Sequence, residues 1–229
     1  MNVAMNPAPA AARRSPIHDA LEARGAEWRD VNGTTFAVRL RDEPAGDDIP
    51  AAALCDLSGL NQLGVKGPDA ANWLSTAGVD VPADLYESRP LPSGGRVVRF
   101  GAHEFFLEDG IAGSKASELS EQLGFGAEQV YRVEHQDATF LLTGPRSLDV
   151  MAQTCGIDFR EANGGRAIFT RVAGVSCALL PETIADQQAF RLWLDPSYAP
   201  YLWEELVVIV ESLGGHVVGA GRLFPDLPA

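Results

Sequence analysis

The sequence predicts an α+β fold built from two repeated halves with mostly antiparallel sheets. The repeat is visible in two stretches, TFLLTGPRSLDVMAQTCGID at 139–158 and LNQLGVKGPDAANWLSTAGVD at 60–80. Each contains an apolar strand, a Gly-Pro turn, an amphipathic helix and then Gly-Val/Ile-Asp. A Leu-Gly dipeptide at the end of a later helix also recurs, since Leu123-Gly124 corresponds to Leu213-Gly214. A unit of strand, helix, two strands and helix, used twice, implies two sheets that each carry helices on one face.

The first half begins with a short helix and a hairpin. Ser15-Pro16 fits the N-cap and first position of a helix, and Gly25 fits its end. Two extended runs over 28–40 flank Asn32-Gly33, the dipeptide that best accommodates the positive φ angles of a tight turn. We therefore expect a helix, a β-hairpin and then a loop over 41–50.

The repeat unit of the first half follows. Residues 53–58 and 60–66 are expected to be extended, and Gly67-Pro68 ends the second run. The next helix carries one apolar stripe and ends at Gly78. Its stripe consists of Ala70, Trp73, Leu74 and Ala77. The runs RVVRF and EFFLE predict a second hairpin around 101–103, and a helix from Ser114 to Gly124 completes the half.

The second half repeats this plan. Strands are expected at 130–133 and 139–142, followed by a helix with Leu148, Met151, Ala152 and Cys155 on one stripe. The runs 169–180 and 190–194 also have the composition of strands. A last helix, which starts near Asp195-Pro196-Ser197, ends at Gly214-Gly215. The expected organisation is a disordered tail over 1–14, a first half over 15–126 and a second half over 127–229, packed as one unit.

Composition excludes several classes of partner. The formal charge of −13, from 18 basic and 31 acidic residues, argues against nucleic-acid binding, which uses clustered Lys and Arg. The longest apolar run near the end, LVVIV at 206–210, falls far short of the roughly 20 residues that cross a bilayer. The first fourteen residues do not have the pattern of a signal peptide. We therefore expect a cytoplasmic protein with no nucleic-acid or membrane partner.

The cysteines and histidines predict neither disulfides nor a metal site. Cys55, Cys155 and Cys177 lie far apart in apolar surroundings, as buried thiols do. The four histidines form neither an HxxxH motif nor a Cys-His cluster. His103 and Glu104 are adjacent, so in a strand they point to opposite faces, and a hairpin tip is the favoured interpretation.

Several segments resemble a known family. ALCDLSGLNQLGVKGPDAANWL (53–74) resembles the early part of the glycine-cleavage T protein, the folate-dependent aminomethyltransferase. LTGPRSLDVMAQTCGIDF, FTRVAGVSCALLPE and FRLWLDPSYAPYLWEEL are similar to the gamma subunit of heterotetrameric sarcosine oxidase, which shares that fold. The Ser-Tyr-Ala, Leu-Trp and Leu pattern of that subunit is matched by Ser197, Tyr198, Ala199, Leu202, Trp203 and Leu206. The resemblance, over 15–215, implies an aminomethyltransferase-like folate-binding fold.

The departures from the T protein concern its chemistry. In the T protein a Gly-Gly turn leads into an acidic pair that supplies the carboxylate near the folate amine. Here Ser93-Gly94-Gly95 leads directly into RVVRF, so that carboxylate has no counterpart and no catalytic residue is expected. At matching positions, Asp56, Leu60 and Tyr86 are candidates to line a residual folate cavity. For Asp56 and Ser58, hydrogen bonds to the local backbone are the simpler interpretation.

The resemblance implies a non-catalytic gamma-type subunit of a sarcosine-oxidase-like complex. Such a complex demethylates sarcosine or a related N-methyl amine oxidatively, giving glycine, formaldehyde or methylenetetrahydrofolate, and hydrogen peroxide. Alpha and beta subunits would be the partners and would hold FAD, FMN, NAD and tetrahydrofolate, while this chain is expected to bind no cofactor.

Two alternatives stay open. The chain would otherwise be an independent tetrahydrofolate-binding, aminomethyltransferase-like protein or a structural partner of another amine dehydrogenase. Ser197-Tyr198 beside Trp203 is as consistent with a protein interface as with plain packing.

Overall fold

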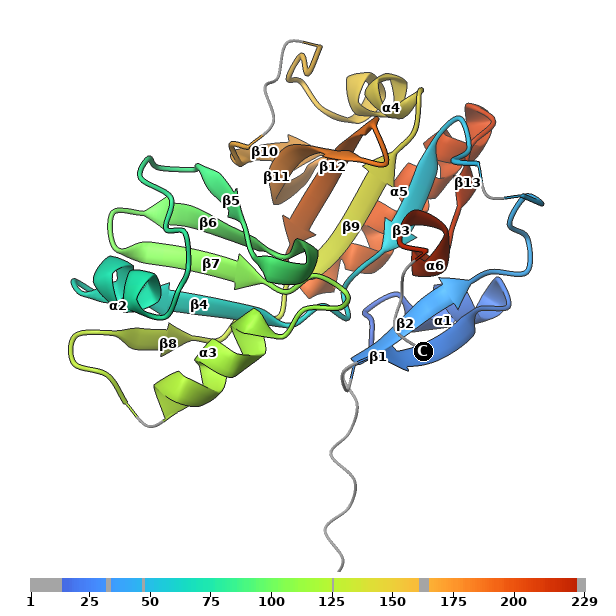
Figure 1. The fold of residues 1–229 in the computed structure, drawn as a ribbon. Helices are drawn as coiled ribbons and strands as arrows, with labels where there is room; N and C mark the ends of the chain where they lie inside the picture. Colours follow the sequence, from blue (N-terminus) through green and yellow to red (C-terminus); the bar gives the residue numbers. More distant parts are fainter. Residues whose placement is uncertain (1–13, 32–33, 47, 125, 161–164, 226–229) are drawn as a thin grey trace, which may run out of the picture.

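The computed structural model describes residues 14–31, 34–46, 48–124, 126–160 and 165–225. The described strands form two large sheets and a separate hairpin (Figure 1). Helices cover one face of each large sheet, and the other faces lie toward each other, with a small apolar cluster between them. This arrangement is the two-sheet α+β fold that the repeated pattern predicts.

The first sheet has the strand order β5-β6-β7-β4-β8, and all its pairs are antiparallel. Its strands are β4 (Gln62–Lys66), β5 (Ser88–Pro90), β6 (Arg96–Gly101), β7 (Glu104–Glu108) and β8 (Tyr131–Val133). Helices α2 (Ala70–Thr76) and α3 (Lys115–Gly124) pack on one face. There Leu63, Phe105 and Leu107 meet Leu74 and Leu119 in one buried cluster, so the apolar stripes of the helices are covered.

The second sheet has the order β10-β11-β12-β9-β3-β13. Its strands are β3 (Ala53–Asp56), β9 (Ala138–Thr143), β10 (Ile168–Val172), β11 (Val175–Ile184), β12 (Gln187–Leu194) and β13 (His216–Val217). The pair β13–β3 is parallel, and the other pairs are antiparallel. Helices α1 (His18–Ala23), α4 (Ser147–Thr154) and α5 (Ala199–Ser212) contribute to the apolar cluster on its outer face.

The internal repeat is present in the topology. The order β6-β7-β4 in the first sheet corresponds to β11-β12-β9 in the second, and α2 and α3 correspond to α4 and α5 (Figure 1). The two Gly-Pro turns also agree in conformation, because Gly67 has φ +136° and Gly144 has φ +103°. Only glycine adopts such angles without strain, which explains the same dipeptide in both copies.

The N-terminal hairpin packs beside the second sheet. It consists of β1 (Glu27–Val31) and β2 (Thr34–Arg39), and its expected Asn32-Gly33 turn lies outside the described residues. Helix α6 (Ala220–Leu223) returns to this hairpin, where Glu43 forms a buried ion pair of 3.1 Å with Arg222. A charge-assisted contact therefore holds α6 against the segment that follows the hairpin.

Several local expectations differ from the structure. The run expected as a strand over 169–180 is broken by a turn at Ala173-Gly174, where both residues have positive φ. Helix α4 stops at Thr154, so Cys155 is its extended C-cap, and Ala152 is exposed.

Trp203 is 2% exposed and packs on Phe140 at 5.1 Å between ring centroids. It belongs to the core and not to an interface.

The strands do not follow the expected boundary between residues 126 and 127. Strand β3, from the first half, pairs within the second sheet between β9 and β13. Strand β8, from the second half, pairs with β4 in the first sheet. The short elements β5, β13, α6 and the 3-10 helices η1 (Pro92–Gly94) and η2 (Pro196–Tyr198) were not expected from the sequence. Residues 1–13 of the expected tail lie outside the described chain.

Candidate functional site

Charged side chains lie between the two sheets because successive side chains of a strand point to opposite faces of its sheet. In β7, Phe105 and Leu107 face the helices, whereas Phe106 contacts the opposite sheet through Trp193. Glu108 lies on the same inward side as Phe106. In β12, Phe190 and Leu192 face the helices, which places Arg191 and Trp193 inward.

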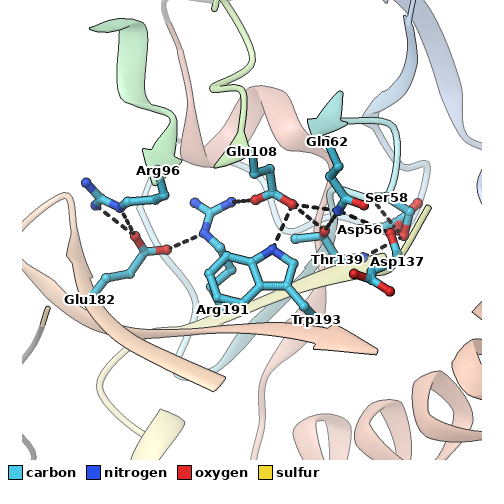
Figure 2. Close-up of polar contacts among 10 residues, drawn as sticks. All are labelled: Asp56, Ser58, Gln62, Arg96, Glu108, Asp137, Thr139, Glu182, Arg191 and Trp193. Carbon is cyan, nitrogen blue, oxygen red and sulfur yellow. Dashed lines mark hydrogen bonds and ion pairs between the residues drawn. The ribbon is translucent and has the colours of Figure 1, made fainter. Parts of the chain in front are cut away.

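Glu108 is 1% exposed and accepts four hydrogen bonds (Figure 2). Its Oε1 accepts from Arg191 Nη1 at 2.9 Å. Its Oε2 accepts from Trp193 Nε1 at 2.8 Å, Thr139 Oγ1 at 2.6 Å and Gln62 Nε2 at 2.9 Å. Four donors therefore surround this buried carboxylate, three at Oε2 and one at Oε1, which matches the number of its lone-pair sites, about four.

Glu182 forms the second half of the same network. Its Oε1 accepts from Arg191 Nε at 2.9 Å, and its Oε2 accepts from Arg96 Nη2 at 2.8 Å. Burial opposes the charged form of Arg191, but Glu182 and Glu108 outweigh it, so the pKa of Arg191 lies above its ordinary value. We call Arg96, Glu108, Glu182 and Arg191 the intersheet ion network.

The intersheet ion network joins the two sheets, because Arg96 and Glu108 lie on the first sheet and Glu182 and Arg191 on the second. Each buried charge has a partner of opposite sign. A base that accepts a proton from a substrate needs a free lone pair within hydrogen-bond reach. The arrangement of Glu108 and Glu182 therefore suits structural cohesion better than acid–base chemistry.

Next to the ion network, a cleft of about 730 Å³ opens between the sheets. The intersheet cleft is lined by Phe100, Glu104, His135, Asp137, Phe169, Thr170, Arg171, Ser176, Cys177, Ala178, Trp193, Leu194 and Asp195. Its volume falls within the usual range of small-molecule sites, about 300–1,000 Å³. Trp193 connects the two features, since its ring lines the cleft while its Nε1 binds Glu108.

One side of the intersheet cleft carries a histidine–carboxylate pair. His135 Nδ1 lies 3.0 Å from Asp137 Oδ2, and the imidazole meets the edge of Phe106 at 5.1 Å. A Cβ at Gly64 would lie 2.7 Å from His135 Cδ2, so the glycine makes room for the ring. The pair is thus held in place by packing and by Asp137.

The three residues predicted to line a folate cavity lie in different surroundings. Asp56 Oδ1 accepts from the backbone N–H and the hydroxyl of Ser58, at 3.1 and 2.6 Å. Leu60 is buried in an apolar cluster with Phe36. Tyr86 is 40% exposed, and its ring lies 5.8 Å from Phe169 at the opening of the intersheet cleft. The lining of the cleft includes none of the three.

The intersheet ion network was missed by the sequence reasoning, although the sequence contains a signal for it. Arg191 interrupts the apolar run FRLWL, and Glu182 and Glu108 end the apolar runs CALLPE and EFFLE. A charge inside a strand of buried character requires a partner, because an unpaired buried charge is very costly. That signal indicates that partners exist but does not say which residues they are.

Two further classes of site are absent from the described ranges. No group of three or more His, Cys, Asp or Glu side chains there is arranged to hold a metal ion. No helix of that part of the chain is long and apolar enough to cross a membrane.

The three thiols are free and buried, which gives a first testable prediction. Burial, with Cys155 nearby, raises the pKa of Cys177 to about 12. The thiolate is the reactive form, so at pH 8 alkylation of Cys177 should be on the order of a thousandfold slower than in the unfolded chain. Iodoacetamide labelling followed by mass spectrometry measures this, with the urea-unfolded chain as control. Equal rates in the two states would contradict the burial of this thiol.

Comparison of sequences finds relatives among aminomethyltransferases. No family model matches the chain. It is 26% identical over 214 residues to the aminomethyltransferase of Saccharopolyspora erythraea, a match that covers 85% of this chain and 57% of the relative. The aminomethyltransferase of Moorella thermoacetica is 22% identical over 224 residues, covering 91% and 61% of the two chains. The chain thus spans about three fifths of the length of these relatives.

Comparison of structures finds the same fold in two solved proteins. Aminomethyltransferase T of the glycine cleavage system from Bartonella henselae superposes with a TM-score of 0.71 and 20% identity, over 90% of this chain and 59% of that one. A chain of the heterotetrameric sarcosine oxidase from Corynebacterium sp. U-96 superposes with a TM-score of 0.64 and 24% identity, over 89% and 97%. This chain therefore has the aminomethyltransferase-like fold of the glycine-cleavage T protein, as its resemblance predicts.

Proposed function

We propose that this chain is a non-catalytic, gamma-type subunit of a sarcosine-oxidase-like complex. The observation that carries the proposal is the superposition on nearly the whole of one chain of a heterotetrameric sarcosine oxidase. The superposition covers 97% of a chain of the heterotetrameric sarcosine oxidase but 59% of aminomethyltransferase T. A fold that covers nearly the whole of one chain of that complex supports a role as a subunit of a related complex.

The chemistry of the space between the sheets supports a non-catalytic role. Glu108 and Glu182 are the deeply buried carboxylates there, and arginine side chains neutralise both. Ser93-Gly94-Gly95 leads into β6 without an acidic pair, so the reacting carboxylate of the T protein has no counterpart at this turn. In the proposed complex, alpha and beta subunits hold FAD, FMN and NAD and carry out the oxidation of the N-methyl amine.

Co-expression tests the proposal. The chain carries an affinity tag and is produced together with alpha- and beta-type subunits of a sarcosine-oxidase-like complex. We expect a complex of defined stoichiometry that has flavin absorbance and produces hydrogen peroxide when sarcosine is added. Production of the alpha- and beta-type subunits without this chain is the control. A stable monomer that leaves both subunits behind would show the proposal to be wrong.

A second candidate is an independent tetrahydrofolate-binding, aminomethyltransferase-like protein. The intersheet cleft favours it, because Phe100, Phe169 and Trp193 offer faces and edges on which a flat heteroaromatic ring packs. Of the predicted folate contacts, Tyr86 lies beside this cleft, through Phe169. The carboxylates that would accept hydrogen bonds from the ring are Glu104, Asp137 and Asp195.

Titration of the isolated chain with tetrahydrofolate separates the two candidates. Under the leading proposal, calorimetry detects no binding at micromolar concentrations. The folate-binding candidate would be favoured by micromolar binding to the parent chain. That binding should then be lost in Trp193→Leu and retained in Trp73→Leu on α2. Trp73 is the matched control because it packs in the helix-covered cluster of the first sheet, away from the intersheet cleft.

A further inference from the structure

A pair of exposed aromatic side chains lies at the opening of the intersheet cleft. Tyr86 is 40% exposed and Phe169 is 58% exposed, and their rings meet edge to face at 5.8 Å. Phe100 lies behind Phe169 at 5.1 Å, and Leu85, beside Tyr86, is 45% exposed. We call Leu85, Tyr86, Phe100 and Phe169 the aromatic mouth. Grouped exposed apolar side chains mark interaction sites more often than scattered ones do.

The backbone of Tyr86 is held in an unfavourable conformation. Its φ of +66° lies in the left-handed region, which a bulky side chain rarely adopts. Two short hydrogen bonds hold it there: its N–H donates to Arg99 O at 2.7 Å, and its carbonyl accepts from Ala167 N at 2.7 Å. Such strain persists where the surrounding structure fixes it, and it is concentrated at functional sites. The exposed ring is therefore pre-positioned, which lowers the entropic cost of binding to it.

Charges around the aromatic mouth are already compensated within the chain. Asp84 lies 3.6 Å from Arg166, and Glu87 lies 2.6 Å from Arg89. Glu104 likewise pairs with Lys66 at 3.2 Å, and Asp137 Oδ2 lies within hydrogen-bond distance of His135 Nδ1, at 3.0 Å. On a chain of net charge −13 this is a locally balanced surface. Two protein surfaces that bind each other have complementary electrostatic potentials. The partner surface that fits the aromatic mouth is therefore uncharged and apolar.

We propose that the aromatic mouth binds an uncharged apolar segment of the partner subunit in the complex proposed above, with one large apolar side chain inserted into the intersheet cleft. The inserted side chain packs on Phe169 and Phe100 and reaches toward Trp193, while Tyr86 covers its outer side. The cleft has room for such an anchor, with a volume of about 730 Å³. Interfaces are dominated by a few anchors of this kind in well-packed pockets. This inference rests on the proposed function.

Titration of the alpha- and beta-type subunits with variants of this chain tests the inference. Phe169→Asp places a charge in the contact, and we expect it to weaken binding at least about thirtyfold, the effect of a hot-spot residue. Tyr86→Gly removes the exposed ring while glycine tolerates the backbone conformation. This variant should lose affinity yet stay at least as stable as the parent chain in thermal unfolding.

The control is Tyr198→Ala, because Tyr198 is 57% exposed on η2 and belongs to the other surface that resembles an interface. We expect it to bind as the parent chain does. If the parent chain binds and the mouth variants bind equally well, the inference is wrong while the proposed function stands. If the parent chain does not bind at all, both are wrong. Self-association through the mouth, or displacement of the partner by tetrahydrofolate, would also overturn the inference by identifying another occupant.

Discussion

Replacing Arg191 with methionine is expected to lower the free energy of unfolding by about 3–5 kcal/mol, the usual effect of breaking a buried ion pair. Methionine fills much of the same space but leaves Glu108 and Glu182 without the guanidinium that each contacts at 2.9 Å. Both carboxylates are buried, at 1% and 8% exposed, so water does not replace the lost partner. Urea unfolding followed by circular dichroism measures the change, and the melting temperature should fall by roughly 6–20 °C.

The matched control is Arg171→Met, which makes the same chemical change on the exposed strand β10. It should alter stability by no more than about 0.5 kcal/mol, as surface substitutions usually do. A triple variant adds Glu108→Gln and Glu182→Gln to Arg191→Met and so removes the unpaired charges. It should recover part of the lost free energy of unfolding. Equal, small losses for Arg191→Met and Arg171→Met would mean that the intersheet ion network does not hold the sheets together.

The second large effect is expected at the glycines of the two Gly-Pro turns. A Cβ at Gly67 would lie 2.1 Å from Gln129 O, and one at Gly144 would lie 2.6 Å from Pro50 O. Both residues also have strongly positive φ. Backbone strain and the forced displacement of a neighbouring carbonyl each cost about 1–3 kcal/mol. Gly67→Ala and Gly144→Ala should therefore each lower the free energy of unfolding by about 2–6 kcal/mol, measured by urea unfolding.

Gly78 provides the control for this pair. It follows α2 and has φ +81°, but no heavy atom lies within 4 Å of a Cβ placed there. Gly78→Ala thus introduces the conformational strain alone, about 1–2 kcal/mol. The difference between Gly67→Ala and Gly78→Ala isolates the close approach of the Gln129 carbonyl. Similar losses at the two positions would show that the turn relaxes to accept the side chain.

Much of the fold follows from local patterns in the sequence. The helical stripe that includes Leu74, the hairpin of RVVRF and EFFLE and the two Gly-Pro turns are all encoded within a few residues of one another. Pairing between distant segments is not encoded in this way. Strand β13 is two residues long and forms only because Ala53 lies beside His216. For the same reason, the exchange of β3 and β8 between the sheets was not predictable from periodicity.

The candidate site was harder to predict than the fold. Glu108 and Arg191 are 83 residues apart in the sequence and meet only when the two sheets pack. Trp203 was left open between an interface and packing, because a tryptophan beside two glutamates on a helix suits both, and its position on α5 turns it toward Phe140 in the core. Family resemblance indicated the general fold, but the intersheet cleft depends on the relative placement of the sheets.

The exchange of strands between the sheets has a consequence for synthesis of the chain on the ribosome. Strand β3 is made early, yet its two neighbours in the sheet are β9 and β13, and β13 lies at 216–217 of 229 residues. The second sheet is therefore incomplete until residue 217 has emerged. Non-local pairing of this kind slows folding and leaves unpaired strand edges exposed while the chain is incomplete. One edge of β3 thus stays without its parallel partner until β13 has been made.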